Sequence, residues 1–193
     1  MIEPGFVIDN PFSRSRVEIL PCEDLERGTG WLLEVRRPPG AGPDNSEHRH
    51  ATWTESFEII AGSAAYKLDG AEGRLAAGES LSMPPGRWHI HPWNAGDSEL
   101  VFRQHATFAP ADRRAFREVF GGFATIADLA RQGKLRGHGR PNNPLRMAAT
   151  LRLSLRYGRQ DAATPFWVQR LVSATLGTLA EAIGLGAIDQ RYR

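Results

Sequence analysis

The sequence predicts a mainly β fold, either an antiparallel sandwich or a closed barrel, followed by an α-helical extension. Residues 14–108 contain short apolar segments separated by turn sequences such as PPGAGP, DGAEG and NAGD. The 193 residues include 20 glycines and 13 prolines, more than average, and so provide for many turns. After Pro110 the apolar residues recur at helical spacing instead.

Six short segments in the first half are predicted to be strands. Several short strands at close spacing are typical of a sandwich or a barrel. The Asp69-Gly70 pair within KLDGAEGRL predicts the tip of a hairpin. The predicted strands are residues 16–20, 30–35, 57–60, 64–68, 80–83 and 100–107.

The second half is predicted to form helices joined by short loops. The first helix is expected to stop at Gly121-Gly122, because glycine disfavours a helix interior. Thr164 followed by Pro165 has the order of an N-cap and a first-turn proline, so the last helix is expected to begin there. KLRGHGRPNNP is expected to be a loop, and the predicted helices are residues 111–120, 125–132, 144–157 and 165–184.

We therefore expect residues 1–109 to form the barrel and residues 110–193 to form a helical extension packed on the barrel or on a partner subunit. The last helix is apolar on several sides and carries only Arg170 and Glu181 as charged residues. Such a helix is expected to be buried on more than one side. Binding to a membrane surface is disfavoured, because its polar face lacks the lysines and arginines that meet anionic lipid.

Composition and charge exclude several classes of protein. The single cysteine, Cys22, rules out an intrachain disulfide and a cysteine zinc site. The N-terminus has no signal-peptide pattern and no apolar run reaches 18 residues, so we expect a cytoplasmic protein without membrane contact. Residues 103–193 carry a net charge of +9 against −7 for residues 1–102, but their arginines are scattered, which disfavours nucleic-acid binding.

The stretch from Gly42 to Trp93 contains a set of possible metal ligands. His48 and His50 are two residues apart, so on a strand both imidazoles point to the same face. Glu55 opens the next apolar segment and can face the two histidines if the strands are antiparallel. His89 follows a Pro-Pro-Gly turn and opens another strand. Two imidazoles side by side form half of a metal site.

The same stretch resembles the cupin family. The first cupin motif is matched at every spacing, and the second is matched except at its asparagine, where Trp93 stands and Asn94 comes one residue late. A one-residue bulge after His89 would accommodate this difference. The matching residues are Gly42, His48, His50, Glu55 and Gly62 in the first motif, and Gly78, Pro84, Gly86 and His89 in the second.

The resemblance implies a double-stranded β-helix, or jelly roll, in which His48, His50, Glu55 and His89 bind one divalent metal per chain. The mixed nitrogen and oxygen set suits Fe, Mn, Ni, Co, Cu or Zn and does not suit Ca or Mg. Four protein ligands on an octahedral ion leave two positions for water, dioxygen or substrate.

Aromatic residues flank the proposed ligands. Trp53 lies between His50 and Glu55, Phe57 shares the phase of Glu55, and Trp93 follows His89. Their side chains either line a pocket for a flat or apolar substrate or plug the barrel.

Two further polar residues are candidates for the substrate site. His91 is two residues after His89 and is expected to face the same interior, as a general base or as a hydrogen-bonding neighbour of the ligands. Arg103 would bind a substrate carboxylate or phosphate if it pointed inward. The alternative is that Phe102 and Gln104 point inward and Arg103 faces solvent.

The leading function is a metal-dependent enzyme that oxidises or cleaves a small organic molecule with dioxygen. A metal-dependent isomerase, cyclase or lyase is the first alternative, and a cupin that binds a small ligand without turnover is the second. We also expect a homodimer, because small antiparallel barrels have sheet edges that need cover.

Overall fold

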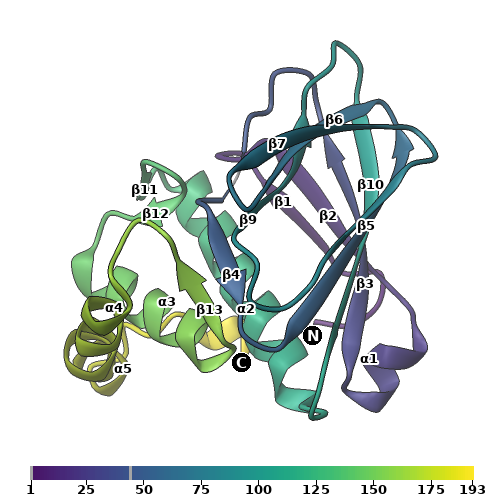
Figure 1. Cartoon of the computed structure of the whole chain (residues 1–193). Coiled ribbons are helices and arrows are strands. Elements are labelled where there is room, and N and C mark those ends of the chain that lie inside the picture. The colour runs from purple at the N-terminus through teal and green to yellow at the C-terminus, as the bar shows by residue number, and fades with distance from the viewer. Residues whose placement is uncertain (1, 44) are drawn as a thin grey trace.

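The computed structural model describes residues 2–43 and 45–193 and places two antiparallel sheets around a shared core (Figure 1). One sheet has the strand order β1-β2-β3-β10-β5-β8, and the other has the order β13-β4-β9-β6-β7. This arrangement confirms the predicted β-barrel fold class. The strands are β1 (Val7–Asn10), β2 (Ser15–Leu20), β3 (Gly30–Arg37), β4 (His48–His50), β5 (Trp53–Ala61), β6 (Ser63–Leu68), β7 (Ala71–Ala76), β8 (Ser80–Met83), β9 (His89–Asn94), β10 (Leu100–Phe108), β11 (Leu135–Arg136), β12 (Arg140–Pro141) and β13 (Arg159–Asp161).

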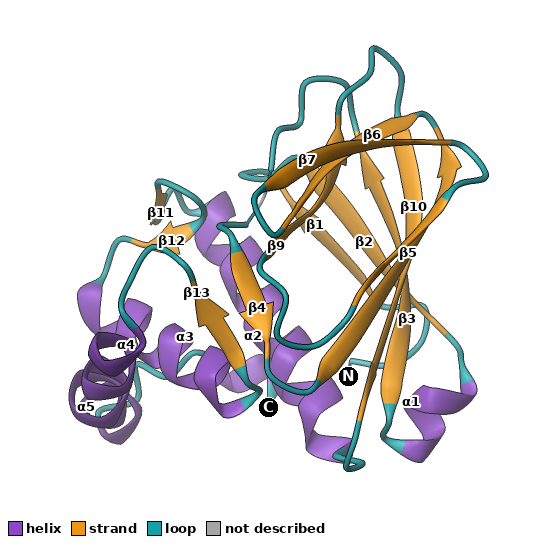
Figure 2. Cartoon of the chain, viewed as in Figure 1, coloured by secondary structure: helices purple, strands orange, loops and turns teal. Residues whose placement is uncertain are grey.

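Most helices follow the barrel in sequence and lie to one side of it (Figure 2). None of the helices in the described part of the chain has the length and apolarity needed to cross a membrane. The helices are α1 (Glu23–Arg27), α2 (Arg113–Arg131), α3 (Pro144–Arg156), α4 (Phe166–Val172), the π-helical turn η1 (Ser173–Gly177), α5 (Thr178–Ala182) and the 3₁₀ turn η2 (Gln190–Tyr192).

Alternation along the strands builds the core between the sheets. In β5, Trp53, Glu55, Phe57 and Ile59 are buried while the residues between them face outward. This confirms that Phe57 and Ile59 share the phase of Glu55. Burying a large apolar side chain stabilises the fold by roughly 1.5–3 kcal/mol, so the same alternation that fixes the register also points Glu55 into the barrel.

All six predicted strand segments are found within strands of the structure, in β2, β3, β5, β6, β8 and β10. The predicted hairpin is also confirmed, since β6 and β7 pair up to Leu68 and Ala71 around Asp69-Gly70. Both turn residues have positive φ, 47° at Asp69 and 83° at Gly70, the conformation of a tight two-residue turn.

The prediction that Gly121-Gly122 ends a helix is wrong. Helix α2 runs through both glycines from Arg113 to Arg131. A Cβ on Gly121 would lie 2.8 Å from a methyl carbon of Ile188, and one on Gly122 would lie 2.9 Å from a methyl carbon of Leu153. The two glycines therefore allow close packing of neighbouring elements against α2, and this tertiary packing outweighs their low helix propensity.

Helix α2 belongs to the same core as the barrel. Its buried face contributes Phe116, Val119 and Phe120 to the cluster that also contains Trp31 of β3. The rings of Trp31 and Phe120 meet edge to face with centroids 5.3 Å apart. The first helix after the barrel is thus a part of the barrel's core packing.

Residues 134–144 were expected to be a loop, but they contain a short hairpin in which β11 pairs with β12. More important for the site, the C-terminal half also supplies a barrel strand. Strand β13 pairs with β4, with Arg159 opposite His50 and Asp161 opposite His48. The C-terminal half is therefore not purely helical, and it completes the smaller face of the barrel.

The last helix begins at Phe166, with Pro165 at the cap position and no side-chain capping bond. Thr164 is therefore not the N-cap that the sequence suggested. The sequence predicted that this helix is buried on several sides. Within one chain it is not, because Trp167, Leu171 and Ile183 are all more than half exposed.

Candidate metal centre

Three strands bring five potential ligands together in the barrel interior. Strand β4 provides His48 and His50, β5 provides Glu55, and β9 provides His89 and His91. His48 and His89 are directly opposite each other across the β4–β9 pair. One ligand atom from each of the five residues lies within 4.8 Å of the corresponding atoms of the others. The structure thus brings the four ligands expected from the sequence into one cluster and adds His91.

The carboxylate of Glu55 is at the centre of this cluster. Its Oε2 atom lies 3.0 Å from Nε2 of His91, 3.1 Å from Nε2 of His89 and 3.4 Å from Nε2 of His50. Metal–nitrogen and metal–oxygen bonds of about 2.0–2.2 Å put adjacent ligands about 3 Å apart. The observed separations are close to this value, although the contact with His91 is also that of a hydrogen bond.

Backbone carbonyls orient two of the imidazoles. Nδ1 of His48 donates to the Ser46 carbonyl at 2.8 Å, and Nδ1 of His89 donates to the Arg87 carbonyl at 2.9 Å. A proton held on Nδ1 leaves the Nε2 lone pair free, which is the form that binds a metal. Both rings are therefore fixed in the tautomer that a ligand requires.

Gln104 orients the carboxylate in the same way. Its side-chain amide donates to Oε1 of Glu55 at 2.7 Å, so that Oε2 is left facing the histidines. Sequence reasoning considered Gln104 only as an inward-facing alternative to Arg103 and missed this bond. The alternation along the two strands could have indicated it. Gln104 lies directly opposite Phe57 of β5, so both side chains point to the same face of the sheet.

Two buried nitrogens of the cluster have no hydrogen-bond partner, namely Nδ1 of His50 and Nε2 of His89. Nε2 of His89 is close to Glu55, but the ring is not oriented for a hydrogen bond to that oxygen. A buried polar atom without a partner is costly unless an unseen group satisfies it. The unpartnered nitrogen of His89 and the donor set of imidazoles and one carboxylate fit a divalent transition metal.

Burial sets the protonation state of the cluster. It lowers the pKa of His48 well below the usual value, with Arg159 and the neighbouring histidines adding to the effect. It also lowers the pKa of His50 to about 3, against an opposing effect of Glu55. Burial alone would raise the pKa of Glu55, but His91 and His50 outweigh it and hold that pKa well below its usual value. Neutral imidazoles and an ionised carboxylate are the forms that bind metal.

We expect the metal-free protein to lose stability as the pH falls below about 6.5. The pKa of His50 is about 3 in the folded protein and near 6.5 in the unfolded chain, so the unfolded chain binds more protons between these values. The contribution of His50 to stability is therefore present above pH 6.5 and declines toward pH 3. The loss of stability is measured as the fall in the thermal unfolding midpoint between pH 7.5 and pH 4.5.

His50→Gln removes this titration and should weaken the pH dependence, although the lowered pKa of His48 leaves part of it. His138→Gln, in an exposed loop, should leave the pH dependence unchanged. Equal acid sensitivity in the unmodified chain and in both variants would contradict the assignment.

Aromatic rings cover the cluster. The ring of Trp53 stacks on His50 with centroids 4.6 Å apart and an interplanar angle of 10°. The ring of Phe57 lies 5.2 Å from that of His91. Trp93 is half-buried on β9, and among the described residues it has no ring contact with the histidines. Of the three aromatic residues expected in a pocket, Trp53 and Phe57 are therefore placed against the ligands.

The expectation that Arg103 lines the site is corrected by the structure. Arg103 is exposed, whereas the flanking Phe102 is buried and Gln104 reaches Glu55. Side chains alternate along β10, so the inward position of Phe102 and Gln104 turns Arg103 to solvent.

His91 faces the interior as expected and is the most accessible member of the cluster. Its side chain is 17% exposed, against 1–4% for those of His50, Glu55 and His89. Its Nε2 atom donates to Oε2 of Glu55 at 3.0 Å, and its ring is stacked on His89 with an interplanar angle of 11°. A small molecule that approached the cluster would meet His91 first.

The bulge proposed from the displaced asparagine is confirmed. Strand β9 pairs Ile90 with Lys67 and Trp93 with Ala65, so it holds one residue more than β6 over this interval. Past the bulge, Asn94 is buried and its amide donates to the carbonyls of Arg37 and Ser98. Asn94 therefore ties β9 to the end of β3 despite its late position.

Strand β13 was missed by sequence reasoning. Three residues without an apolar pattern carry no strand signal of their own. The strand is held on its outer side by the buried side chain of Gln169 in α4. This amide accepts a hydrogen bond from the backbone N–H of Asp161 and donates one to its carbonyl. On its inner side it pairs with the strand that carries His48 and His50. The C-terminal half thus positions two of the ligands.

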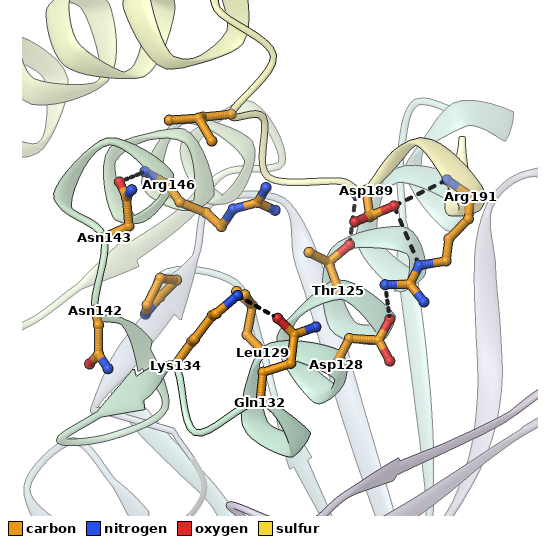
Figure 3. Close-up of a pocket in the computed structure, with 12 residues that line it drawn as sticks. Thr125, Asp128, Leu129, Gln132, Lys134, Asn142, Asn143, Arg146, Asp189 and Arg191 are labelled. Atoms are coloured by element: carbon orange, nitrogen blue, oxygen red, sulfur yellow. Dashed lines mark hydrogen bonds and ion pairs between the residues drawn. The ribbon is translucent and has the colours of Figure 1, made fainter.

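A separate cleft of about 480 Å³ lies between α2, the start of α3 and the C-terminal segment (Figure 3). Asp128, Arg146 and Arg191 are among its lining residues, and Arg191 is paired with Asp128 at 3.0 Å. None of the five cluster residues lines this cleft. It is therefore not the access route to the candidate metal centre.

Several solved structures are similar to part of this chain. A predicted oxalate decarboxylase from Thermotoga maritima is 20% identical, with a TM-score of 0.43 over 49% of this chain and 80% of that one. An RmlC-like cupin from Shewanella frigidimarina is 17% identical, with a TM-score of 0.43 over 53% and 83%. KdgF from Halomonas sp. is 17% identical, with a TM-score of 0.40 over 49% and 79%. A comparison with curated proteins found no match.

The family comparison covers the strands that carry the cluster. Residues 33–105 match the family model described as a cupin domain, and this range extends from β3 to β10. All five residues of the cluster lie within it. The chain therefore contains a cupin domain, which is followed in the sequence by a largely helical extension.

Proposed function

We propose that this chain is a metal-dependent enzyme that acts on a small organic molecule, with oxygen-dependent oxidation or cleavage as the leading reaction. The observation that carries the proposal is the cluster itself: several imidazoles and one carboxylate, deeply buried, converge with an unpartnered ring nitrogen toward one point. His48, His50, Glu55 and His89 would hold the ion. A redox-active ion such as iron would supply electron transfer between substrate and dioxygen at its open positions.

The residues around the cluster have distinct tasks in this proposal. Trp53 is buried against the ring of His50 and Phe57 against the ring of His91, and both keep water from the outer sides of these rings. Gln104 keeps one carboxylate oxygen occupied, so that Glu55 offers the other to the ion. His91 holds a proton at Nε2 beside Glu55 and is accessible enough to exchange it with a bound molecule.

A non-redox isomerase, cyclase or lyase is the second candidate, and the position of His91 is the observation that favours it. Such reactions move a proton beside a polarised carbonyl group, and a partly exposed imidazole at the cluster suits that step. A cupin that binds a small ligand without turnover is the third candidate. We further propose that the partner is a small molecule, not nucleic acid or membrane, and that the protein works in the cytoplasm.

The test combines metal analysis with assays in air and without oxygen. Freshly purified protein is analysed for Fe, Mn, Ni, Co, Cu and Zn, and oxygen uptake is then followed with a panel of small catechols, thiols and dicarbonyl compounds. Oxygen uptake that requires both the metal and one compound supports the leading reaction. Turnover that continues without oxygen would instead support the isomerase or lyase, and binding without turnover would support the third candidate.

Replacing His91 by glutamine is expected to lower kcat by about 10²–10⁴-fold, the usual contribution of a positioned acid or base. Glutamine keeps a hydrogen-bond donor near Glu55 but cannot take up a proton at neutral pH. The metal content of the variant should remain that of the unmodified protein. His105→Gln is the matched control, since His105 is paired with Asp24 outside the cluster. An unchanged kcat in His91→Gln would remove His91 from the mechanism.

A further inference from the structure

The segment formed by α4, η1 and α5 exposes an unusual amount of apolar surface. Six of the nine exposed large apolar side chains among the described residues lie on it, with exposed fractions from 42% to 69%. We call this surface the apolar helix face. It consists of Phe166, Trp167, Leu171, Leu176, Leu179 and Ile183, at the outer end of the helical part (Figure 1).

The opposite side of the same segment is already packed within the chain, and it uses small or polar residues. Gln169, Ser173, Gly177 and Ala180 are buried there. A Cβ on Gly177 would lie 3.0 Å from the Ala148 carbonyl of α3, so α3 approaches the segment closely. The large apolar residues thus face outward while the small ones face inward, the reverse of what a helix needs when only its own chain covers it.

The exposed area approaches the size that one side of a stable interface buries. With full areas of roughly 150–250 Å² for a large side chain, the six exposed fractions leave on the order of 600 Å² uncovered. The largest apolar patch on a typical monomer covers about 300–600 Å², and stable interfaces bury about 800 Å² on each partner. The adjacent exposed Ala174 and Ala182 extend the face toward that size.

The area and the position of the face point to a second copy of this chain as the occupant. The face reaches from Phe166 to Ile183, so residues 175 and 176 lie near its middle. If two copies pair antiparallel about an axis between these two residues, the apolar side chains of each copy meet those of the other. Charge does not strengthen this contact, because Glu181 is already paired with Arg152 and Arg156 of its own chain, at 3.0 Å and 3.6 Å.

We propose that two copies of this chain associate through the apolar helix face, with their α4–α5 segments antiparallel about a two-fold axis. Such an interface is isologous, so the same apolar patch on each copy covers that of the other. A membrane surface is the competing occupant. The face has Arg170 as its one exposed cation, fewer than a helix that lies on anionic lipid carries.

The first test is the mass of the full chain by light scattering between 1 and 100 μM. We expect a dimer, and we expect Leu171→Glu at the centre of the face to raise its dissociation constant at least 30-fold, because buried apolar anchors dominate interface energy. Phe123→Glu is the matched control, since Phe123 is 51% exposed but lies on α2 outside the face. Metal content should be the same in both variants, which separates this outcome from failure of the metal site.

The second test fixes the geometry. In a Cys22→Ser background, Thr175→Cys should form a disulfide-linked dimer under mild oxidation, because residue 175 is exposed and lies beside the proposed axis. Ala163→Cys, exposed but far from the axis, should not. A monomer at 100 μM, or a dimer that Leu171→Glu leaves intact, would overturn the proposal. So would a monomer that sediments with vesicles of phosphatidylcholine and phosphatidylglycerol, because the membrane would then be the occupant.

Discussion

A chain carrying both His50→Ala and His89→Ala is expected to lose nearly all of its bound divalent metal. Each substitution removes one imidazole from a cluster in which the ligand atoms lie within 4.8 Å of one another. Loss of a hydrogen-bond partner of a ligand already costs 10–100-fold in metal affinity, so loss of a ligand itself should cost more than about 100-fold. The measurement is the number of metal ions per chain in freshly purified protein, determined by elemental mass spectrometry.

Two controls make this experiment decisive. His105→Ala removes an imidazole paired with Asp24 and should leave the metal content unchanged. Circular dichroism shows whether the double variant remains folded, which matters because His50 and His89 are both buried. Stoichiometric metal in a folded double variant would rule out the site.

The chain shortened to residues 1–110 is expected to be insoluble or loosely packed, although it retains all five residues of the cluster. It loses Phe116, Val119 and Phe120, which belong to the core of the barrel. At roughly 1.5–3 kcal/mol for each large side chain, their loss removes on the order of 5 kcal/mol or more, a large share of the 5–15 kcal/mol of a typical domain. Near-ultraviolet circular dichroism and binding of an apolar dye distinguish loose from native packing.

The shortened chain also loses β13, the neighbour of the strand that carries His48 and His50. A full-length Gln169→Leu chain isolates this second effect, because Gln169 holds β13 through the backbone of Asp161 and the Thr164 carbonyl. We expect it to fold with weakened metal affinity. If residues 1–110 alone fold cooperatively and hold metal, the C-terminal half is an independent module that the barrel does not need.

The ligands could be predicted from the sequence because their chemistry is local. His48 and His50 share a strand face at a spacing of two, and the turn before His89 fixes where the next strand begins. The bulge was inferred from the resemblance to the second cupin motif, in which Asn94 comes one residue late, and the structure shows it. Metal binding by these residues stays a prediction.

What could not be predicted depends on contacts between distant segments. Gly121 and Gly122 looked like a helix stop because propensity is local, whereas the packing of Ile188 and Leu153 against them is not. The inward phase of β10 was decided by Gln104 meeting Glu55 on the neighbouring strand. The residues of the last helix showed how much apolar surface it carries, but they could not show that one chain leaves most of it uncovered.

The pairing of β13 with β4 has a consequence for biosynthesis. Ser46, next to the ligand strand, is bonded to Asp161, which is 115 residues further along the chain. A ribosome that adds about 5–20 residues per second needs on the order of ten seconds to cover that interval, and the exit tunnel delays the emergence of β13 further. During that time the nascent barrel lacks one strand beside two of its histidines. A metal held by this cluster would therefore reach its final surroundings only after nearly the whole polypeptide has emerged, and a product that ends before β13 would lack that strand.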